Sequence, residues 1–99
     1  MKETKAFIIF ISLDKCQSKF FQEMAMKAGF LKKEFGFGSY LLFQPVNGNG
    51  EEVIRINEYS ERDFLIIDLW SLPTKIKVIL ASILTECGVE KSKTEAFYT

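Results

Sequence analysis

The first apolar stretch of the chain has the pattern of a buried β-strand. Residues 6–13 are almost all apolar, rich in β-branched and aromatic side chains, and too few to form an independent helix. Both alternating sets of side chains in this stretch are apolar, so neither face of the strand has a solvated pattern. We therefore expect a strand that is covered on both sides.

The spacing of apolar residues then changes to three and four, which is typical of an amphipathic helix. Asp14 fits the N-cap of this helix, and Gln17 completes a capping-box pattern three positions later. Gly29 fits the left-handed position just after the last turn. The predicted apolar stripe consists of Cys16, Phe20, Phe21, Met24, Ala25 and Ala28.

Three further strands are predicted in the middle of the chain. The expected order is a connection at 31–38, strands at 39–46 and 51–58, a polar turn at 59–62 and an apolar strand at 63–70. The segment between the first two of these strands reads Asn-Gly-Asn-Gly, and both residue types tolerate the positive φ angles of a hairpin turn. The pattern therefore predicts a hairpin followed by another strand.

A second amphipathic helix follows the last of these strands. It opens at residues 71–74, where Pro73 is tolerated in the first turn, and it closes at Gly88 and Val89. Its apolar stripe consists of Leu72, Ile76, Ile79, Leu80, Ile83, Leu84 and Cys87. Residues 94–98 are expected either to add a short edge strand or to fray.

The predicted elements follow the order β-α-β-β-β-α, with a last strand as an option. A chain of 99 residues is too short to divide, so residues 1–99 are expected to form a single α+β domain. Two helices should cover one face of a mostly antiparallel sheet of four or five strands. The nearest common architecture is ferredoxin-like or a variant of it, because the chain has one strand more than the usual βαββαβ order.

Two of the predicted strands, at 6–13 and 63–70, leave an apolar face without a predicted helix to cover it. The side chains on this face are Ile8, Phe10, Phe64, Ile66 and Trp70. Soluble monomers rarely expose a patch of this size. A second copy, the C-terminal segment or a different protein would cover it, and we favour a homodimer because symmetric dimers are the commonest oligomers. The alternative is a more curved sheet whose second face is core.

The composition excludes several kinds of active site. The chain has no histidine, which removes the usual general base and metal ligand. Its two cysteines fit neither a disulfide-dense scaffold nor a four-ligand zinc site, so we expect no metal, no cofactor and a reducing cytoplasm. The apolar run near the N-terminus is shorter than a membrane span and lacks the cleavage site of a secretion signal.

The two cysteines are interpreted as structural. Cys16 lies between Lys15 and Lys19 in the first helical turn, where positive charge would activate a thiol. It also lies on the predicted apolar stripe, and without a base or a resolving partner a buried cysteine is the favoured interpretation. The same interpretation applies to Cys87, and a disulfide between the two is left open.

The charges are balanced overall but unevenly distributed. Thirteen basic residues match thirteen acidic ones, while residues 34–70 hold two arginines against seven acids. We expect the acidic hairpin region to bind a basic partner through Glu51, Glu52, Glu58, Glu61 and Asp63. Nucleic acid is disfavoured as a partner, because this segment supplies most of the sheet and would repel phosphate. Nucleic acid could then bind only through the lysines of the first helix.

Asp68 is the least ordinary carboxylate, because it lies within an apolar strand beside Ile66 and Trp70. A buried carboxylate needs a partner, and a cross-strand ion pair with Arg55 is the favoured interpretation. Gly36 and Gly38 begin a phosphate-loop pattern, but position 41 is leucine and a strand follows, which favours a simple connection.

The leading hypothesis is a small non-enzymatic interaction protein, of the inhibitor or immunity type, that binds a basic macromolecule. The alternative is an enzyme with a pocket between subunits that acts on a small nucleotide-like ligand. In that case Asp68 or Glu58 would be the acid or base, and Tyr59 or Tyr40 the proton donor. A lysine-dependent nucleic-acid binder is the third hypothesis.

Overall fold

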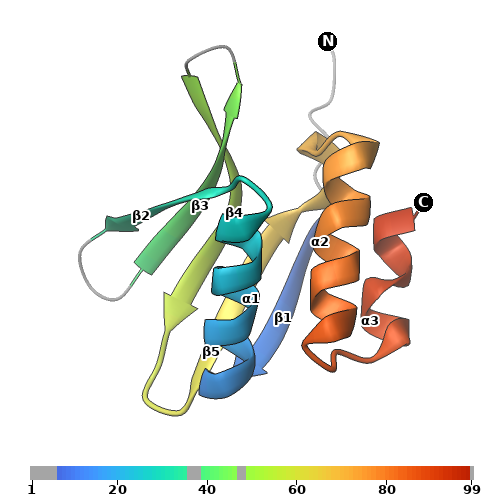
Figure 1. The fold of residues 1–99 in the computed structure, drawn as a ribbon. Helices are drawn as coiled ribbons and strands as arrows, with labels where there is room; N and C mark the ends of the chain where they lie inside the picture. The colour runs from blue at the N-terminus through green and yellow to red at the C-terminus, as the bar shows by residue number, and fades with distance from the viewer. Residues whose placement is uncertain (1–6, 36–38, 47–48, 99) are drawn as a thin grey trace, which may run out of the picture.

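The computed structural model describes the backbone of residues 7–35, 39–46 and 49–98. It describes the side chains of residues 7–34 and 53–98. The elements in chain order are β1 (Ile8–Asp14), α1 (Lys15–Lys27), β2 (Leu31–Phe35), β3 (Ser39–Val46), β4 (Asn49–Glu58), β5 (Arg62–Asp68), the 3₁₀ turn η1 (Leu69–Ser71), α2 (Thr74–Glu86), α3 (Lys91–Thr94) and the 3₁₀ turn η2 (Glu95–Tyr98). The predicted α+β class is confirmed (Figure 1).

The strands form one sheet in the order β1-β5-β4-β3-β2, and all neighbours are antiparallel. Helix α1 joins β1 and β2, which lie at opposite edges of this sheet. The ferredoxin-like arrangement is not confirmed, because β2 to β5 pair as consecutive antiparallel neighbours and β1 then pairs with β5. The physical basis is the short connections, which favour pairing between strands that follow each other in sequence.

Strand β2 occupies part of the segment predicted as a connection. Its residues pair with β3 from Leu31 opposite Phe43 to Phe35 opposite Ser39. The prediction was wrong for residues 31–35, because Lys32 and Lys33 have little intrinsic preference for a strand. Pairing with the β3 backbone outweighs that weak preference. Gly36 and Gly38, which suggested the phosphate-loop alternative, lie outside the described residues.

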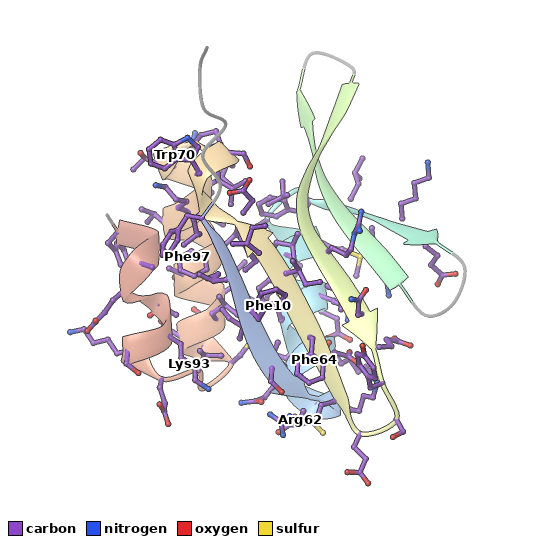
Figure 2. All side chains as sticks on the ribbon, turned by 180° about the vertical axis from the view of Figure 1, so that it is seen from behind. Phe10, Arg62, Phe64, Trp70, Lys93 and Phe97 are labelled. Carbon is purple, nitrogen blue, oxygen red and sulfur yellow. The ribbon has the colours of Figure 1, made fainter. Side chains whose placement is uncertain are left out.

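Strand β5 ends at Asp68, two residues before the predicted end. The Asp68 side chain accepts a hydrogen bond from the Trp70 backbone N–H at 3.1 Å, which caps η1 and turns the chain out of the sheet. Trp70 therefore lies in the turn rather than in the strand. Its side chain is 64% exposed, beyond the Asp68 end of the sheet (Figure 2).

Helix α1 has the predicted ends, and its buried face shares Phe21 and Ala25 with the predicted stripe. The Asp14 carboxylate accepts from the Gln17 backbone N–H at 2.7 Å, and the Gln17 amide oxygen accepts from the Asp14 N–H at 3.1 Å. Gly29 has the expected positive φ of 103°. The buried residues are Ser18, Phe21, Gln22 and Ala25. Cys16 is exposed, so its assignment to the buried stripe was wrong.

Helix α2 follows its predicted stripe closely. The buried members of that stripe are Ile76, Leu80, Ile83 and Leu84, and Leu72, Ile79 and Cys87 are partly buried against the core. Gly88 ends this region with a φ of 90°. The apolar spacing was sufficient to predict the buried face of α2, because the buried residues of this helix are all apolar.

The C-terminal segment forms helical turns instead of a strand. Helix α3 and η2 pack beside α2 (Figure 1), and the side chain of Phe97 is fully buried in the core. The prediction of an edge strand or a frayed end was therefore wrong. Burial of Phe97 contributes about 1.5–3 kcal/mol to holding this segment, and Thr94 of the same segment is buried as well.

The helices leave one face of the sheet uncovered. The core fills the space between helices and sheet, where Ile11, Leu13, Leu65 and Ile67 from the strands meet Phe21 from α1. Seen from behind, β1 and β5 have no helix in front of them (Figure 2). In the part of the chain that is described, no helix has the length and apolarity to cross a membrane.

Candidate interaction surface

The outer face of the sheet, which is turned away from α1 and α2, carries exposed apolar side chains on β1. Alternation along the strand buries Ile11 and Leu13 and turns the even-numbered residues outward. Phe10 is 68% exposed and Ile8 is 50% exposed. The doubly apolar pattern of this strand therefore has one set of side chains in the core and the other on the surface.

Strand β5 extends this apolar surface. Leu65 and Ile67 are fully buried, and the intervening Phe64 and Ile66 are half-buried on the outer face. The register places Phe10 opposite Ile66. The outer apolar patch is therefore a contiguous set made of Ile8, Phe10, Phe64 and Ile66, which are four of the five residues predicted for an oligomer interface. Figure 2 shows Phe10 and Phe64 on the two neighbouring strands.

A hollow of about 550 Å³ lies at the β4–β5 turn end of this patch. Its lining residues are Phe10, Asn57, Tyr59, Ser60, Glu61, Arg62, Phe64 and Ile66. The rings of Tyr59 and Phe64 meet edge to face, with centroids 5.2 Å apart and planes at 88°. Arg62 donates from Nε to the Ser12 Oγ at 2.5 Å and from Nη2 to the Ser12 carbonyl at 3.4 Å. The hollow is therefore aromatic with one guanidinium at its rim.

Asp68 lies at the other end of the patch, beside a second hollow of about 400 Å³. Its Oδ1 accepts from the backbone N–H of Phe7 at 3.2 Å and of Trp70 at 3.1 Å. Arg55 lines the same hollow as Asp68, and Arg55 lies opposite Ile66 in the register. The two residues thus share a face of neighbouring strands, and their ion pair stays a prediction.

The acidic residues predicted to bind a partner do not share one environment. Glu58 and Glu61 are exposed around the β4–β5 turn. Asp63 is only 3% exposed and is held by Lys15 Nζ and Ser18 Oγ, each at 2.5 Å. Asp63 is therefore a structural group facing α1 rather than a group available to a partner. The side chains of Glu51 and Glu52 lie outside the described residues.

The residues of the alternative active site are not brought together. Glu58 lines a hollow of about 330 Å³ on the α1 side of the sheet, while Tyr59 lines the hollow on the outer face. Asp68 lies at the opposite end of β5. The side chain of Tyr40 lies outside the described residues. General acid–base catalysis needs its groups within hydrogen-bond reach of one substrate, which this arrangement does not provide for the described members.

The two cysteines are both free, and they differ in environment. Cys16 is exposed at the start of α1, and Cys87 is partly buried after α2. Burial, together with the nearby charge of Glu86, raises the pKa of the Cys87 thiol to about 11. Cys87 is therefore a protonated, weakly reactive thiol at neutral pH. Among the side chains that the structure describes, no three acidic or thiol groups converge as a metal site would require.

Two sets of polar contacts that organise this region were not predicted from the sequence, one around Ser18 and one around Ser12. Ser18 and Gln22 lie one turn apart on the inner face of α1, and the Gln22 amide donates to Ser18 Oγ at 3.0 Å while Ser18 donates to Asp63. The available signal was the four-residue spacing of Ser18 and Gln22 beside the buried residues Phe21 and Ala25. The contact of Arg62 with Ser12 had no signal in the sequence, since it depends on the pairing of β1 with β5.

Comparison with known proteins gives no relative: no protein-family model matches the sequence, and no curated protein or solved structure matches it either.

Proposed function

We propose that this chain is a small, non-enzymatic interaction protein that self-associates through the outer apolar patch. The observation that carries the proposal is the exposure of Phe10, at 68%, within a contiguous apolar surface on paired strands. Single exposed apolar residues are ordinary, but a contiguous patch on a sheet face is typical of an association surface. Burial of one such phenylalanine contributes about 1.5–3 kcal/mol.

A second copy of the chain is the occupant that the charges of this face support. The outer face of β5 carries a positive residue, Arg62, at one end and a negative residue, Asp68, at the other, with Phe64 and Ile66 between them. A face of this kind is complementary to itself when the second copy is reversed. Symmetric contacts between identical faces are also the commonest form of oligomer.

The proposal includes a basic partner for the exposed acidic residues of the β4–β5 turn. Glu58 and Glu61 remain at the surface, and neither is required by the fold in the way that Asp63 is. Carboxylates at the rim of an interface raise the association rate and the selectivity for a basic protein. A cytoplasmic location also belongs to this proposal, supported by the two free thiols.

The test compares Phe10→Glu with a matched control, Val78→Glu, by light scattering of the eluting protein at several concentrations. Val78 is also an exposed apolar residue, but it lies on α2, away from the outer face. Phe10→Glu should raise the dissociation constant for self-association by about tenfold or more, because an interface core tolerates charge poorly. Val78→Glu should leave association unchanged. Equal behaviour of the two variants would contradict the proposed surface.

A further inference from the structure

Strand β5 begins and ends with residues of opposite charge, and their positions bear on how two copies of the chain would be oriented in a dimer. Arg62 and Asp68 lie on the same outer face and are six positions apart, which is about 20 Å at the rise of a strand. Phe64 and Ile66 occupy the two positions between them on that face. Arg62 and Phe64 are seen at the turn end of the outer face in Figure 2. The strand therefore has a positive end, an apolar centre and a negative end.

Both charged groups keep capacity for another contact. Arg62 is exposed, and its guanidinium donates to Ser12 of the described residues, which uses only part of its five N–H donors. Asp68 is half-buried, and both hydrogen bonds that its side chain accepts from described residues go to Oδ1. A carboxylate oxygen accepts from two donors, so Oδ2 has room for a guanidinium of another copy beside the predicted pair with Arg55. The second carboxylate oxygen and the remaining guanidinium N–H groups are the complementary partners of a charge-assisted hydrogen bond.

Two-fold packing of this face against itself has two simple forms. With the axis along the strands, β5 lies parallel to β5 of the second copy, so that Arg62 faces Arg62 and Asp68 faces Asp68. With the axis across the strands, β5 of the two copies is antiparallel, and each Arg62 faces an Asp68. Like charges that face each other across an interface are repulsive, which disfavours the first form.

We propose that two copies pack their outer faces with β5 antiparallel to β5, so that Arg62 of each copy pairs with Asp68 of the other. The apolar centre then lies between two ion pairs, with Phe64 of one copy over Ile66 of its mate. Sheets that pack face to face keep their strands within about 30° of alignment, so this register is available to twisted sheets. This inference rests on the proposed function, because it assumes that the outer apolar patch is the contact.

In this dimer the charged pairs determine the orientation of the two copies. They supply only a small part of the affinity of self-association. Ion pairs at the edge of an interface contribute little binding energy, but wrong pairings of like charge are costly. The apolar centre supplies the attraction, and the ends decide which of the two forms is occupied. Self-association should accordingly weaken as salt is raised, because exposed charges are screened.

The test is a charge exchange at the two ends, measured by sedimentation equilibrium. Arg62→Asp alone should raise the dissociation constant about tenfold, because the carboxylate introduced at position 62 would then face Asp68 of the other copy. The double variant, Arg62→Asp with Asp68→Arg, should recover most of that loss. It should form no mixed dimer with the wild-type chain, because each mixed contact would join two like charges. Fluorescent labelling of one of the two proteins reveals mixed dimers.

Other results of the charge-exchange experiment would contradict the antiparallel pairing. Mixed dimers of the double variant with the wild-type chain would show the parallel form and overturn the inference. Failure of the double variant to recover association would overturn it as well, provided that thermal melting shows a folded protein. Since Asp68 also caps η1, Asp68→Asn is the second variant, because its amide oxygen still accepts from Trp70 N–H. It should weaken association several-fold without unfolding, and unchanged association would contradict the pair.

These outcomes separate the inference from the proposed function. A wild-type chain that associates and is dissociated by Phe10→Glu, but not by Arg62→Asp, refutes the antiparallel pairing and leaves the outer patch as the contact. A wild-type chain that does not associate refutes both.

Discussion

Asp63 shows how one buried carboxylate fixes the position of a helix. Its two oxygens accept from Lys15 and Ser18, and Gln22 donates in turn to Ser18, so β5 and α1 are joined by a chain of hydrogen bonds. No buried side-chain polar atom in the described part of the molecule lacks a hydrogen-bond partner. A satisfied network of this kind specifies one register between helix and sheet.

Removal of Asp63 or of its charged partner should destabilise the fold. Asp63→Ala leaves Ser18 buried without its acceptor, and we expect a loss of about 2–4 kcal/mol in the free energy of unfolding. Lys15→Met leaves the Asp63 carboxylate, whose side chain is 4% exposed, without its counter-charge, and we expect a loss of about 1–3 kcal/mol. Urea denaturation measures both losses, and a loss below about 0.5 kcal/mol for Lys15→Met would mean that Ser18 alone satisfies the carboxylate.

The two thiols should differ in reactivity. At pH 8 iodoacetamide should modify Cys16 first, because Cys16 is exposed while burial raises the pKa of Cys87 to about 11 and keeps it protonated. Mass spectrometry of the partly modified protein identifies the site. Preferential modification of Cys87 would contradict this assignment.

The raised pKa of Cys87 also makes the stability depend on pH in one direction. A thiol whose pKa is higher in the folded state than in the unfolded state favours folding at low pH. That contribution is complete below the unfolded pKa near 9.0 and is lost as the pH rises toward about 11. Thermal melting between these pH values should show a smaller decline for Cys87→Ser than for the wild-type chain. An identical decline would exclude Cys87 as its source.

At the scale of elements, the C-terminal turns are the least expected part of the fold. Phe97 anchors them in the core, whereas its neighbour Tyr98 is exposed. Phe97→Ala should lower the free energy of unfolding by about 3 kcal/mol, and Tyr98→Ala by less than about 0.5 kcal/mol. Chemical denaturation of the two variants checks this contrast. Similar small losses would indicate that η2 does not contribute to the core.

The elements that the sequence predicted well are those in which local signals agree. The capping box at Asp14 and Gln17 located the start of α1, and the apolar spacing of α2 identified its buried face. The buried face of α1 was predicted only in part, because Ser18 and Gln22 are polar and only the position of Asp63 explains their burial. Strand β2 was missed because its stability comes from pairing with β3 rather than from its own residues.

The candidate surface was partly predictable for the same reason. Alternation in β1 and β5 identified Ile8, Phe10, Phe64 and Ile66 as outward-facing, and the exposure of Phe10 and Ile8 agrees with it. Trp70 was also predicted for this surface but lies outside the strand, because the cap formed by Asp68 turns the chain into η1. Alternation along a strand does not reveal a local interaction of this kind. Asp63 was predicted to bind a partner, but it is buried against α1, and contacts with an element so distant in sequence could not be predicted.

At the scale of the whole molecule, the sheet has one face under helices and one face that is only partly polar. An antiparallel sheet with a solvated face should carry polar residues there. Strand β4 follows that rule, since Arg55 is exposed and Asn57 is half-buried on the outer face. Strands β1 and β5 do not follow it, because Ile8 and Phe10 are exposed and Phe64 and Ile66 are half-buried on this face. In the proposed dimer, a second copy would cover this apolar surface.

Sedimentation equilibrium of the wild-type chain over a range of concentrations tests the central claim most directly. The account predicts a molar mass that rises from 11.4 kDa toward twice that value as the concentration increases. The patch is small, so the transition should fall in the micromolar range, which corresponds to roughly −8 kcal/mol of association energy. A mass that stays at 11.4 kDa up to high micromolar concentration would contradict self-association through the outer face.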